Sequence, residues 1–174
     1  LRHFAAYSPP HHGGLFLYQE EMSMKILVSA CLLGAPCRYD GQSKGSKAVA
    51  DLGAEHELIP VCPEVLGGLS TPRPPAERQG DGRIVNRAGQ DVTAEYEAGA
   101  AAAVELARRA GCTVAVLKAR SPSCGRGQIY DGSFSGTLIP GDGAAARQLL
   151  AAGLTVLNED EAEGYFQARK ETGI

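Results

Sequence analysis

Short apolar runs alternate with longer amphipathic stretches along most of this chain. The runs with the length and β-branched content of buried strands lie at residues 26–28, 58–61, 113–117 and 154–157. The stretches with a helical pattern lie at residues 46–52, 94–110, 143–152 and 160–170. Strands that alternate with helices in this order predict a parallel sheet with right-handed helical crossovers.

Capping and turn residues mark the ends of several of these elements. Ser46 and Thr93 are expected to cap the amino ends of the first two helices, and Gly111 follows the second one. Pro60 has no amide hydrogen for a sheet ladder. We therefore expect the second strand, which contains Pro60, to lie near an edge of the sheet.

Two polar excursions interrupt the alternation of strands and helices. The first, at residues 70–92, is rich in Pro, Arg and Gly and holds at most a small hairpin near 84–85. The second, at residues 128–138, contains an Asp-Gly turn signal and indicates a hairpin or an irregular excursion. A segment as long as the first one in a compact domain is usually a lid or a binding loop.

The length of 174 residues fits one domain. We predict a single-domain, three-layer α/β/α fold over residues 24–174, with an open, mainly parallel, Rossmann-like sheet of about four to five strands. Residues 1–23 contain consecutive Pro-Pro, His-His and Gly-Gly pairs and lack the pattern of a signal peptide. We expect them to be an upstream extension or an expression remnant outside the fold.

Composition and charge narrow the classes of protein. Apolar residues make up 44% of the chain and charged residues 21%, as in a typical globular protein. The formal net charge of −3 gives no general attraction to nucleic acid or membranes, and no apolar run is long enough to span a bilayer. No Gly-x-Gly-x-x-Gly follows a strand, so no nucleotide cofactor is expected. Without an export signal we expect a cytoplasmic protein, in which thiols stay reduced.

Four of the five cysteines lie at the carboxyl ends of predicted strands or in the loops that follow. Cys31 and Cys62 follow the first two strands, Cys37 lies in the loop after the first, and Cys124 lies in the loop after the third. Ligands bind outside these carboxyl ends in open α/β sheets, so we expect the thiols to converge. Cys112 lies at the opposite edge of the sheet and is expected to be a small buried hydrophobe.

Widely spaced thiols at strand ends suit a catalytic metal centre. All-thiolate sites favour zinc or an iron–sulfur cluster. The paired Cys-x2–4-Cys knuckles of structural zinc and the Cys-x2-Cys-x2-Cys run of ferredoxins are both missing from the sequence. The leading interpretation is a cuboidal cluster held by three thiols with one iron open. Structural zinc and thiol-redox chemistry are the alternatives.

Three motifs occur in order along the chain. They are Cys-Leu-Leu-Gly-x2-Cys-Arg-Tyr-Asp-Gly at 31–41, Cys-Pro-Glu at 62–64 and Lys-x2-Ser-Pro-Ser-Cys-Gly at 118–125. In this order they resemble the bacterial 2-thiouracil desulfurases, and the resemblance covers residues 24 to about 164. It implies a [4Fe–4S] cluster bound by three cysteines, with the fourth iron open to the sulfur of a thiolated pyrimidine. The implied reaction is a non-redox hydrolysis.

The resemblance and the strand ends together predict the roles of individual residues. Cys31, Cys62 and Cys124 are the expected cluster ligands. Cys37 is an alternative ligand in place of one of these, a neighbouring thiol or a proton donor. Three of the four thiols are expected to bind iron.

Acid–base candidates lie beside the cysteines in the same motifs. Glu64 follows Cys62 by two residues and is a candidate to activate water or to protonate the ring nitrogen. Ser121 precedes Cys124 and is a candidate proton relay. Asp40 is the other acid candidate, although Asp-Gly is first of all a turn signal. The candidates for contact with the substrate are Ser123, Lys118 and Arg38.

The predicted function is iron–sulfur-dependent removal of sulfur from 2-thiouracil or a similar small pyrimidine, which gives uracil and sulfide. One alternative is a desulfurase for 4-thiouridine or for a thiolated base in tRNA, although the lack of basic surplus argues against a large RNA. An alternative of another class is a zinc-stabilised binding domain without turnover. Both a monomer and a dimer are compatible with the sequence.

Overall fold

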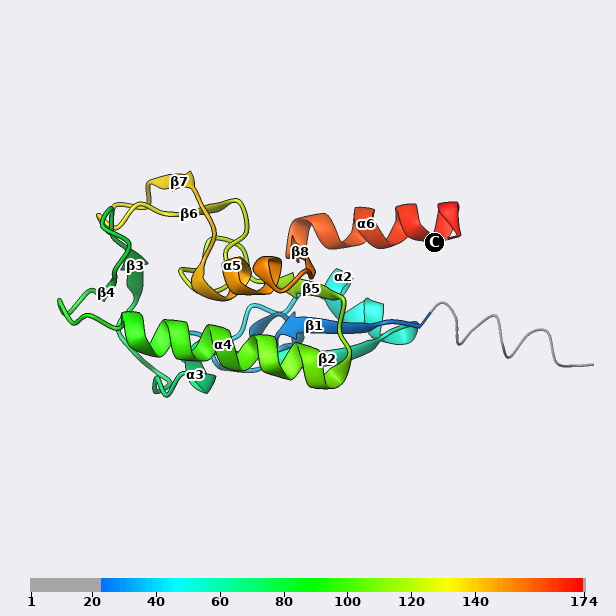
Figure 1. Cartoon of the computed structure of the whole chain (residues 1–174), viewed down its shortest axis with the longest axis horizontal. Coiled ribbons are helices and arrows are strands. Elements are labelled where there is room, and N and C mark those ends of the chain that lie inside the picture. The colour runs from blue at the N-terminus through cyan, green and yellow to red at the C-terminus, as the bar shows by residue number, and fades with distance from the viewer. Residues whose placement is uncertain (1–22, 174) are drawn as a thin grey trace, which may run out of the picture.

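The computed structural model describes residues 23–173 and has four parallel strands at its centre (Figure 1). These strands are β1 (Lys25–Ser29), β2 (Glu57–Val61), β5 (Val114–Leu117) and β8 (Thr155–Asn158). Their spatial order is β2-β1-β5-β8. The prediction of an α/β fold with an open parallel sheet is confirmed. Of the segment 1–23 that was expected to lie outside the fold, residues 1–22 are outside the described residues.

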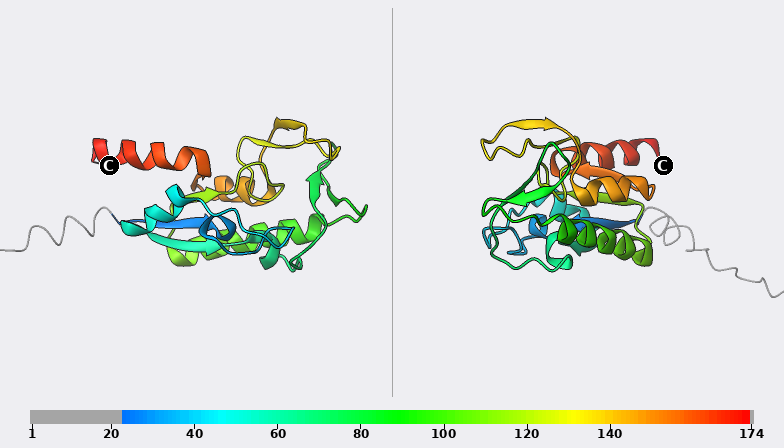
Figure 2. Two further views of the ribbon diagram at one scale, coloured as in Figure 1. Left: turned by 180° about the vertical axis from the view of Figure 1, so that it is seen from behind. Right: turned by 60° about the vertical axis from the view of Figure 1, so that its left-hand side comes forward.

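Helices cover both faces of the sheet (Figure 2). One layer consists of α2 (Lys47–Asp51) and α6 (Glu159–Thr172), and the other of α4 (Thr93–Ala110) and α5 (Ala144–Ala151). Val49 and Phe166 belong to the core on the first face. Ala103 and Leu149 belong to the core on the second face. The predicted three-layer arrangement is therefore confirmed.

The central strand β1 shows why these strands appear in the sequence as continuous apolar runs. Ile26, Leu27 and Val28 are all fully buried. Successive side chains of a strand point to opposite faces of the sheet. Ile26 and Val28 therefore pack with α2 and α6, whereas Leu27 packs with α4 and α5. Because helices cover both faces, no polar alternation remains along the strand.

The chain connects the strands over opposite faces on the two sides of β1. The connection from β1 to β2 contains α2 on one face, and the connection from β2 to β5 contains α4 on the other. The carboxyl ends of β1 and β5 therefore border the crevice in which sheets of this kind bind ligands. β2 is an edge strand, as its Pro60 predicted, and Pro60 lies opposite Val28 in the parallel register.

The two polar excursions fold into antiparallel hairpins that lie together at one end of the molecule (Figure 1). They consist of β3 (Ala76–Arg78) with β4 (Ile84–Asn86), and of β6 (Gln128–Tyr130) with β7 (Leu138–Pro140). β3 contacts β6, and Gln79 Nε2 donates a hydrogen bond to the Gly132 carbonyl at 3.1 Å. Both excursions therefore cover the same end of the sheet, and the hairpin interpretation is confirmed.

The predicted helix ends agree with the structure at two of three positions. The Oγ of Ser46 accepts a hydrogen bond from the first turn of α2 at 3.4 Å, and Gly111 ends α4 with a φ of 77°. The prediction for Thr93 is wrong, because α4 begins at Thr93 with Val92 at the N-cap position. Thr93 Oγ1 instead accepts a hydrogen bond from the Ile84 amide at 2.9 Å, which joins β4 to the start of α4.

Several short elements were not predicted. They are η1 (Ala30–Leu33), η2 (Leu52–Ala54) and α3 (Pro63–Leu66). Each is too short to show a helical period in its apolar residues. The final helix begins one residue earlier than predicted, because Asn158 and Glu161 form a capping box there. Within residues 23–173, no helix has the length and apolar character that a bilayer span requires.

Candidate functional site

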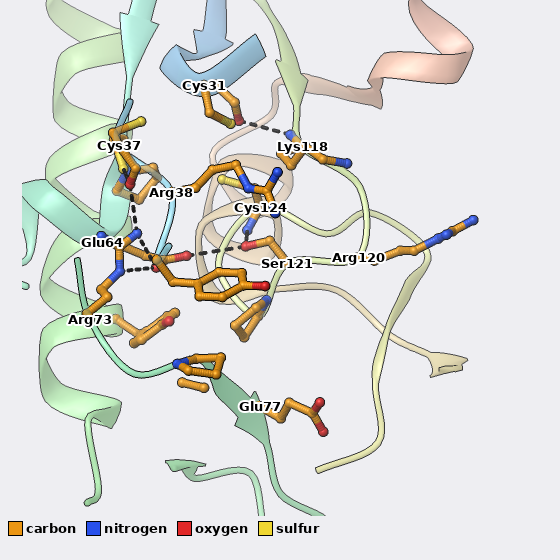
Figure 3. Close-up of a pocket in the computed structure, with 18 of the residues that line it drawn as sticks. Cys31, Cys37, Arg38, Glu64, Arg73, Glu77, Lys118, Arg120, Ser121 and Cys124 are labelled. Carbon is orange, nitrogen blue, oxygen red and sulfur yellow. Dashed lines mark hydrogen bonds and ion pairs between the residues drawn. The ribbon is translucent and has the colours of Figure 1, made fainter. Parts of the chain in front are cut away.

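A cavity of about 490 Å³ opens at the carboxyl ends of the parallel strands (Figure 3). The four cysteines that were expected to converge all line it: Cys31, Cys37, Cys62 and Cys124. Cys112 is buried in the core between α4 and β5 and does not line the cavity. The fold therefore gathers thiols from three segments of the chain and leaves the fifth in the core.

Cys31 and Cys62 are placed by the paired strands that they follow. Cys31 is the second residue after β1, lies in η1 and is 7% exposed. Cys62 follows β2 directly, at the N-cap position of α3. The last residues of the two strands, Ser29 and Val61, are opposite each other in the parallel register. The sheet therefore brings both cysteines to the same edge without a long flexible connection.

Cys124 lies in a tight turn that packs against the start of α5. Glycines allow the backbones to touch there: a Cβ on Gly143 would lie 2.4 Å from the Ser123 oxygen, and one on Gly125 would lie 2.6 Å from the Ser121 oxygen. The first amides of α5 donate hydrogen bonds to carbonyls of this turn. The turn therefore holds the buried thiol of Cys124 in a defined position.

The thiols interact electrostatically across the cavity. Burial is the main cause that raises the pKa of Cys31, Cys37 and Cys124, and the nearby Cys62 thiol raises all three further. The pKa of Cys37 rises to about 12. Clustered thiols of this kind ionise when they bind a soft metal cation as thiolates. The donor set therefore fits a metal centre.

The spread of the thiols distinguishes between kinds of metal centre. No three Cys, His, Asp or Glu side chains within the described part of the chain surround one point as ligands of a single ion would. Tetrahedral zinc needs four ligands around one atom. A [4Fe–4S] cluster takes its cysteine thiolates on separate iron atoms. Thiols distributed around a large cavity therefore fit a cluster better than a structural zinc ion.

Cys37 is held through its backbone. Its carbonyl accepts a hydrogen bond from Arg73 Nη2 at 3.0 Å, and Cys62 Sγ lies 3.8 Å from the same oxygen. The residue lies in the loop after η1 and is half-buried. Cys37 is therefore a neighbour of Cys62 in the wall of the cavity.

Glu64 enters the cavity from the first turn of α3 (Figure 3). Its side chain is 13% exposed, and its Oε2 accepts a hydrogen bond from Arg73 Nε at 2.7 Å and forms an ion pair with Arg73 Nη2 at 2.6 Å. Its Oε1 lies 3.4 Å from Ser121 Oγ. A carboxylate held between a cation and a hydroxyl is able to accept or pass on a proton at its remaining oxygen.

Sequence reasoning missed two residues beside Glu64. Arg73 belongs to the polar segment before β3, Tyr96 belongs to α4, and both side chains line the cavity and are almost fully buried. Burial, and then the neighbouring carboxylate of Glu64, raise the pKa of Tyr96, so this phenol stays neutral. The only signal for Arg73 was its place in a segment expected to bind. Tyr96 gave no signal, because a buried tyrosine on a helix is typical of a core.

Two of the predicted site residues do not line the cavity. Asp40 lies in a turn. Its carboxylate accepts a hydrogen bond from the Gln42 amide at 3.0 Å and forms an ion pair with Arg38 at 3.3 Å. Ser123 is fully buried, and its amide donates to Ser121 Oγ at 3.1 Å. Asp40 therefore stabilises a turn, and Ser123 is part of the packed turn before α5.

Arg38 and Lys118, the two basic candidates, both line the cavity. The Lys118 amide donates to Ser29 Oγ at 2.9 Å, which links the ends of β5 and β1. The Lys118 ammonium donates to Glu159 at the start of α6, and the second oxygen of Glu159 accepts from the Ala119 amide at 2.6 Å. Glu159 was also missed by sequence reasoning, since an acidic residue at a helix start is common.

The outer part of the cavity is formed by the two hairpins. Tyr130, Phe134, Arg87 and Arg120 line it. The Arg87 guanidinium lies over the Phe134 ring, 5.3 Å from its centroid. Arg120 and Phe134 have φ values of 66° and 56°, which are uncommon for residues other than glycine. The mouth of the cavity is therefore aromatic and basic.

The fold and the site together define a class of protein. Thiols that suit a soft metal gather at the carboxyl ends of a parallel sheet, and a carboxylate–hydroxyl pair lies beside them. Structural metal sites are closed by protein ligands, whereas this cavity leaves room for a small molecule. The class is a metal-dependent α/β enzyme.

Comparison with known proteins assigns a family within that class. The profile of the family described as 2-thiouracil desulfurase matches residues 26–161. A solved structure of a [4Fe-4S]-dependent thiouracil desulfidase, TudS, is 50% identical, with a TM-score of 0.78 over 84% of this chain and 98% of TudS. The uncharacterized protein YbbK of Bacillus subtilis (strain 168) is 43% identical over 145 residues, 78% of this chain and 96% of YbbK. The chain belongs to the 2-thiouracil desulfurase family.

The family assignment confirms the resemblance that the three motifs indicated, and it confirms the prediction of an enzyme. The matched region begins in β1 and ends in α6. It therefore contains every thiol of the cavity as well as Glu64 and Ser121. A family of desulfurases favours turnover over the zinc-stabilised binding domain that was the alternative of another class.

Proposed function

We propose that this protein removes sulfur from a thiolated pyrimidine such as 2-thiouracil and releases uracil and sulfide. The reaction is a hydrolysis without net oxidation or reduction, because water supplies the new carbonyl oxygen and sulfur leaves as sulfide. One observation carries the proposal. The cavity that gathers the cysteines also holds the Glu64–Ser121 pair, in a chain of the 2-thiouracil desulfurase family.

A [4Fe–4S] cluster is the cofactor that fits this donor set. Cys31, Cys62 and Cys124 are the proposed ligands, because a strand end or a packed turn holds each of them. Cys37 is the alternative ligand. The bound cluster supplies a soft Lewis acid with an affinity for sulfur. The cluster dependence of the 50% identical TudS supports this assignment.

Glu64 and Ser121 are the proposed acid–base residues. Arg73 occupies Oε2 of Glu64, so Oε1 is the oxygen that takes a proton from the attacking water. Ser121 Oγ donates a hydrogen bond to that oxygen at 3.4 Å, so it orients the carboxylate that takes the proton and passes it to the pyrimidine ring nitrogen. Hydrogen bonds of this kind are often long before substrate binds.

Arg38 and Lys118 are the proposed contacts to the pyrimidine, since both line the cavity. Their cationic donors suit the carbonyl oxygen of the base. Asp40 and Ser123 are left out of the proposed machinery, because neither lines the cavity.

The decisive experiment combines metal analysis with an assay. The protein is purified without oxygen, and its iron, zinc and acid-labile sulfide are measured before sulfide release from 2-thiouracil is assayed. We expect a coloured protein with about four irons per chain that releases sulfide. A colourless, zinc-loaded and inactive protein would refute the proposed function.

Alanine substitutions then identify the ligands. Loss of the cluster is expected at three of the four cavity cysteines, and Cys112→Ala is the matched control that keeps the cluster because Cys112 lies in the core. Loss at only one or two positions would contradict the three-ligand proposal. Glu64→Gln is expected to keep the cluster and to lose turnover. Normal activity of Glu64→Gln would remove this carboxylate from the mechanism.

One observation favours a larger substrate as a second candidate. Arg87 and Arg120 line the mouth of the cavity and form no ion pair with other residues of the described chain. They would meet the parts of 4-thiouridine or a thiolated tRNA that extend beyond the base. The net charge of −3 argues against a large RNA. Comparison of kcat/KM for 2-thiouracil, 4-thiouridine and thiolated tRNA distinguishes these substrates.

We also place this activity in the cytoplasm. All five cysteines are free thiols, and a reducing compartment keeps cluster ligands available. Cell fractionation with detection of the protein tests the location, and recovery in an exported fraction would contradict it.

A further inference from the structure

We propose that Arg73 is a positioning residue that orients the carboxylate of Glu64 toward Ser121 and ties the Cys37 loop to α3. The proposal rests on the proposed function, because it assigns a role within that same site. Arg73 lies outside the three motifs that carry the family resemblance. The geometry around its guanidinium carries the inference.

All three guanidinium nitrogens of Arg73 donate hydrogen bonds within the protein. Nε donates to Glu64 Oε2 at 2.7 Å, Nη2 donates to the Cys37 carbonyl at 3.0 Å, and Nη2 also lies 2.6 Å from Glu64 Oε2 as an ion pair. Nη1 donates to the Ser70 carbonyl at 3.1 Å and to Thr71 Oγ1 at 3.2 Å. An arginine side chain has five N–H donors. Four of these donors have an acceptor within the protein, so the guanidinium is directed at Glu64 and the neighbouring loops and not at the substrate.

These contacts separate the two oxygens of Glu64. Oε2 accepts the hydrogen bond from Nε and forms the ion pair with Nη2, whereas Oε1 points toward Ser121 Oγ at 3.4 Å (Figure 3). A free carboxylate side chain would rotate and exchange the two oxygens. The planar fork of the guanidinium prevents that exchange, which the single point charge of a lysine would not do.

Arg73 also connects two thiol-bearing segments that are far apart in the sequence. Its side chain reaches the Cys37 carbonyl on one side and α3, which follows Cys62, on the other. Its own amide donates to the Tyr39 carbonyl at 2.8 Å. The loop around Cys37 is thereby held at a constant position relative to Glu64.

The burial of the Arg73–Glu64 pair indicates that the pair positions the carboxylate of Glu64 more than it stabilises the fold. The side chains are 6% and 13% exposed, so both charges have lost most of their hydration. Buried ion pairs contribute little net stability, because desolvation offsets their attraction. Such a pair therefore serves mainly to hold a fixed geometry, and here the geometry directs Oε1 of Glu64 into the cavity.

The test compares Arg73→Gln, Arg73→Lys, Glu64→Gln and the double variant Arg73→Gln with Glu64→Gln. The protein is loaded with its cluster, and iron and sulfide content, kcat and KM for 2-thiouracil, and the urea midpoint of unfolding are measured for each. Arg83→Gln is the matched control, because Arg83 pairs with Asp81 at 2.8 Å on the exposed hairpin turn.

We expect Arg73→Gln and Arg73→Lys to keep the cluster and the KM while kcat falls about 10²-fold, the effect of a misplaced catalytic group. In the Glu64→Gln background, the Arg73→Gln change should cause no further loss of activity. The two single shifts of the urea midpoint should likewise not add in the double variant. Arg83→Gln should resemble the wild type in every measurement.

Other outcomes would overturn the positioning role. A higher KM with an unchanged kcat would mean that Arg73 contacts the substrate. Loss of the cluster in both Arg73 variants would mean that the main role of Arg73 is to hold the cluster ligands in place and not to orient Glu64. Additive losses with Glu64→Gln would mean that it acts independently of that carboxylate. Failure of the proposed function is a separate result, because it shows as absent activity or absent cluster in the wild type.

Discussion

Ser121 Oγ lies between two backbone amides and the carboxylate of Glu64. It accepts hydrogen bonds from the amides of Ser123 and Cys124, each at 3.1 Å, and it lies 3.4 Å from Glu64 Oε1. A serine hydroxyl has two acceptor lone pairs and one hydrogen. Because the amides occupy the lone pairs, the single hydrogen is directed at Glu64. The turn that presents the Cys124 thiol therefore also sets the direction of the serine proton.

Replacement of this hydroxyl should affect both activity and stability. We expect Ser121→Ala to lower kcat about 10²- to 10⁴-fold, the usual contribution of a positioned proton-transfer group. Ser121→Ala also leaves the amides of Ser123 and Cys124 without their acceptor. This loss should lower the free energy of unfolding by about 1–3 kcal/mol. Steady-state kinetics and urea titration measure the two effects. Ser121→Thr keeps the hydroxyl and should recover part of kcat; equal loss in both variants would contradict a proton role.

The contact between α3 and α4 depends on a glycine. A Cβ on Gly99 would lie 1.9 Å from the Pro63 carbonyl oxygen, between Cys62 and Glu64 in the chain. We expect Gly99→Ala to displace α3, to lower the free energy of unfolding by about 1–3 kcal/mol through overpacking, and to reduce the cluster content. Urea titration and iron analysis check both effects.

Gly164 provides the control for that substitution. It lies within α6, and a Cβ added to it would have no neighbouring atom within 4 Å. Gly164→Ala should therefore raise the free energy of unfolding by about 0.5–1 kcal/mol, because alanine loses less backbone freedom than glycine in a helix. Glycine-to-alanine substitution is thus expected to lower the free energy of unfolding at Gly99 and to raise it at Gly164. Equal effects at both would contradict the close approach of α3 to α4.

Lys118 has a hydrogen that is able to reach the substrate. Its Nζ donates to Glu159 and, at 3.4 Å, to the Ala119 carbonyl, while an ammonium group has three donors. We expect Lys118→Met to raise the KM for 2-thiouracil about tenfold, as for the loss of a charged hydrogen bond, with unchanged iron content. Lys47→Met is the control, because Lys47 is 87% exposed on α2. An unchanged KM would remove Lys118 from substrate binding.

The stability of the fold should decrease in mild acid because of His56. Burial is the main cause that lowers the pKa of His56 below its usual 6.5, and its Nδ1 accepts a hydrogen bond from the Met24 amide at 3.3 Å. The folded state therefore binds fewer protons than the unfolded state. The contribution of neutral His56 is complete above pH 6.5 and is lost as the pH falls through 6.5 toward the folded-state pKa.

Urea titrations at pH 7.5 and 5.5 measure this effect. The wild type should lose more stability between the two values than His56→Phe, which keeps the ring contact with Phe166 at 5.0 Å but does not titrate. An equal loss in the two proteins would show that other groups cause the pH dependence. The experiment is carried out without oxygen so that the cluster is protected from oxidation in both titrations.

The fold was predictable because its signals are local. The apolar run at Ile26–Val28 indicates a strand that is covered on both faces, and the structure buries all three side chains. Pro60 indicates an edge, and Gly111 indicates the end of a helix. The prediction for Thr93 was wrong because a threonine at the start of a helix resembles an N-cap. Its hydroxyl instead accepts a hydrogen bond from the Ile84 amide of the neighbouring hairpin. That bond joins separate elements, so no local pattern records it.

The site was predictable only as far as its motifs extend. Cys31, Cys62 and Cys124 were expected to converge, since the carboxyl ends of parallel strands meet at one edge. Asp40 and Ser123 belong to the same motifs but do not line the cavity. Their side chains face a turn or the interior, and a motif does not state which way each of its side chains points.

The sequence by itself determined the strands, the helices and the residues delivered at the strand ends, because these depend on neighbours a few positions apart. Only the tertiary structure decided which side chains pair in the cavity. Glu64 meets Ser121 57 residues later in the chain, and Lys118 meets Glu159 41 residues later. Arg73 joins the Cys37 carbonyl, 36 residues earlier, to the carboxylate of Glu64. Such contacts depend on how the crossovers pack against the sheet, and that packing is a property of the whole chain.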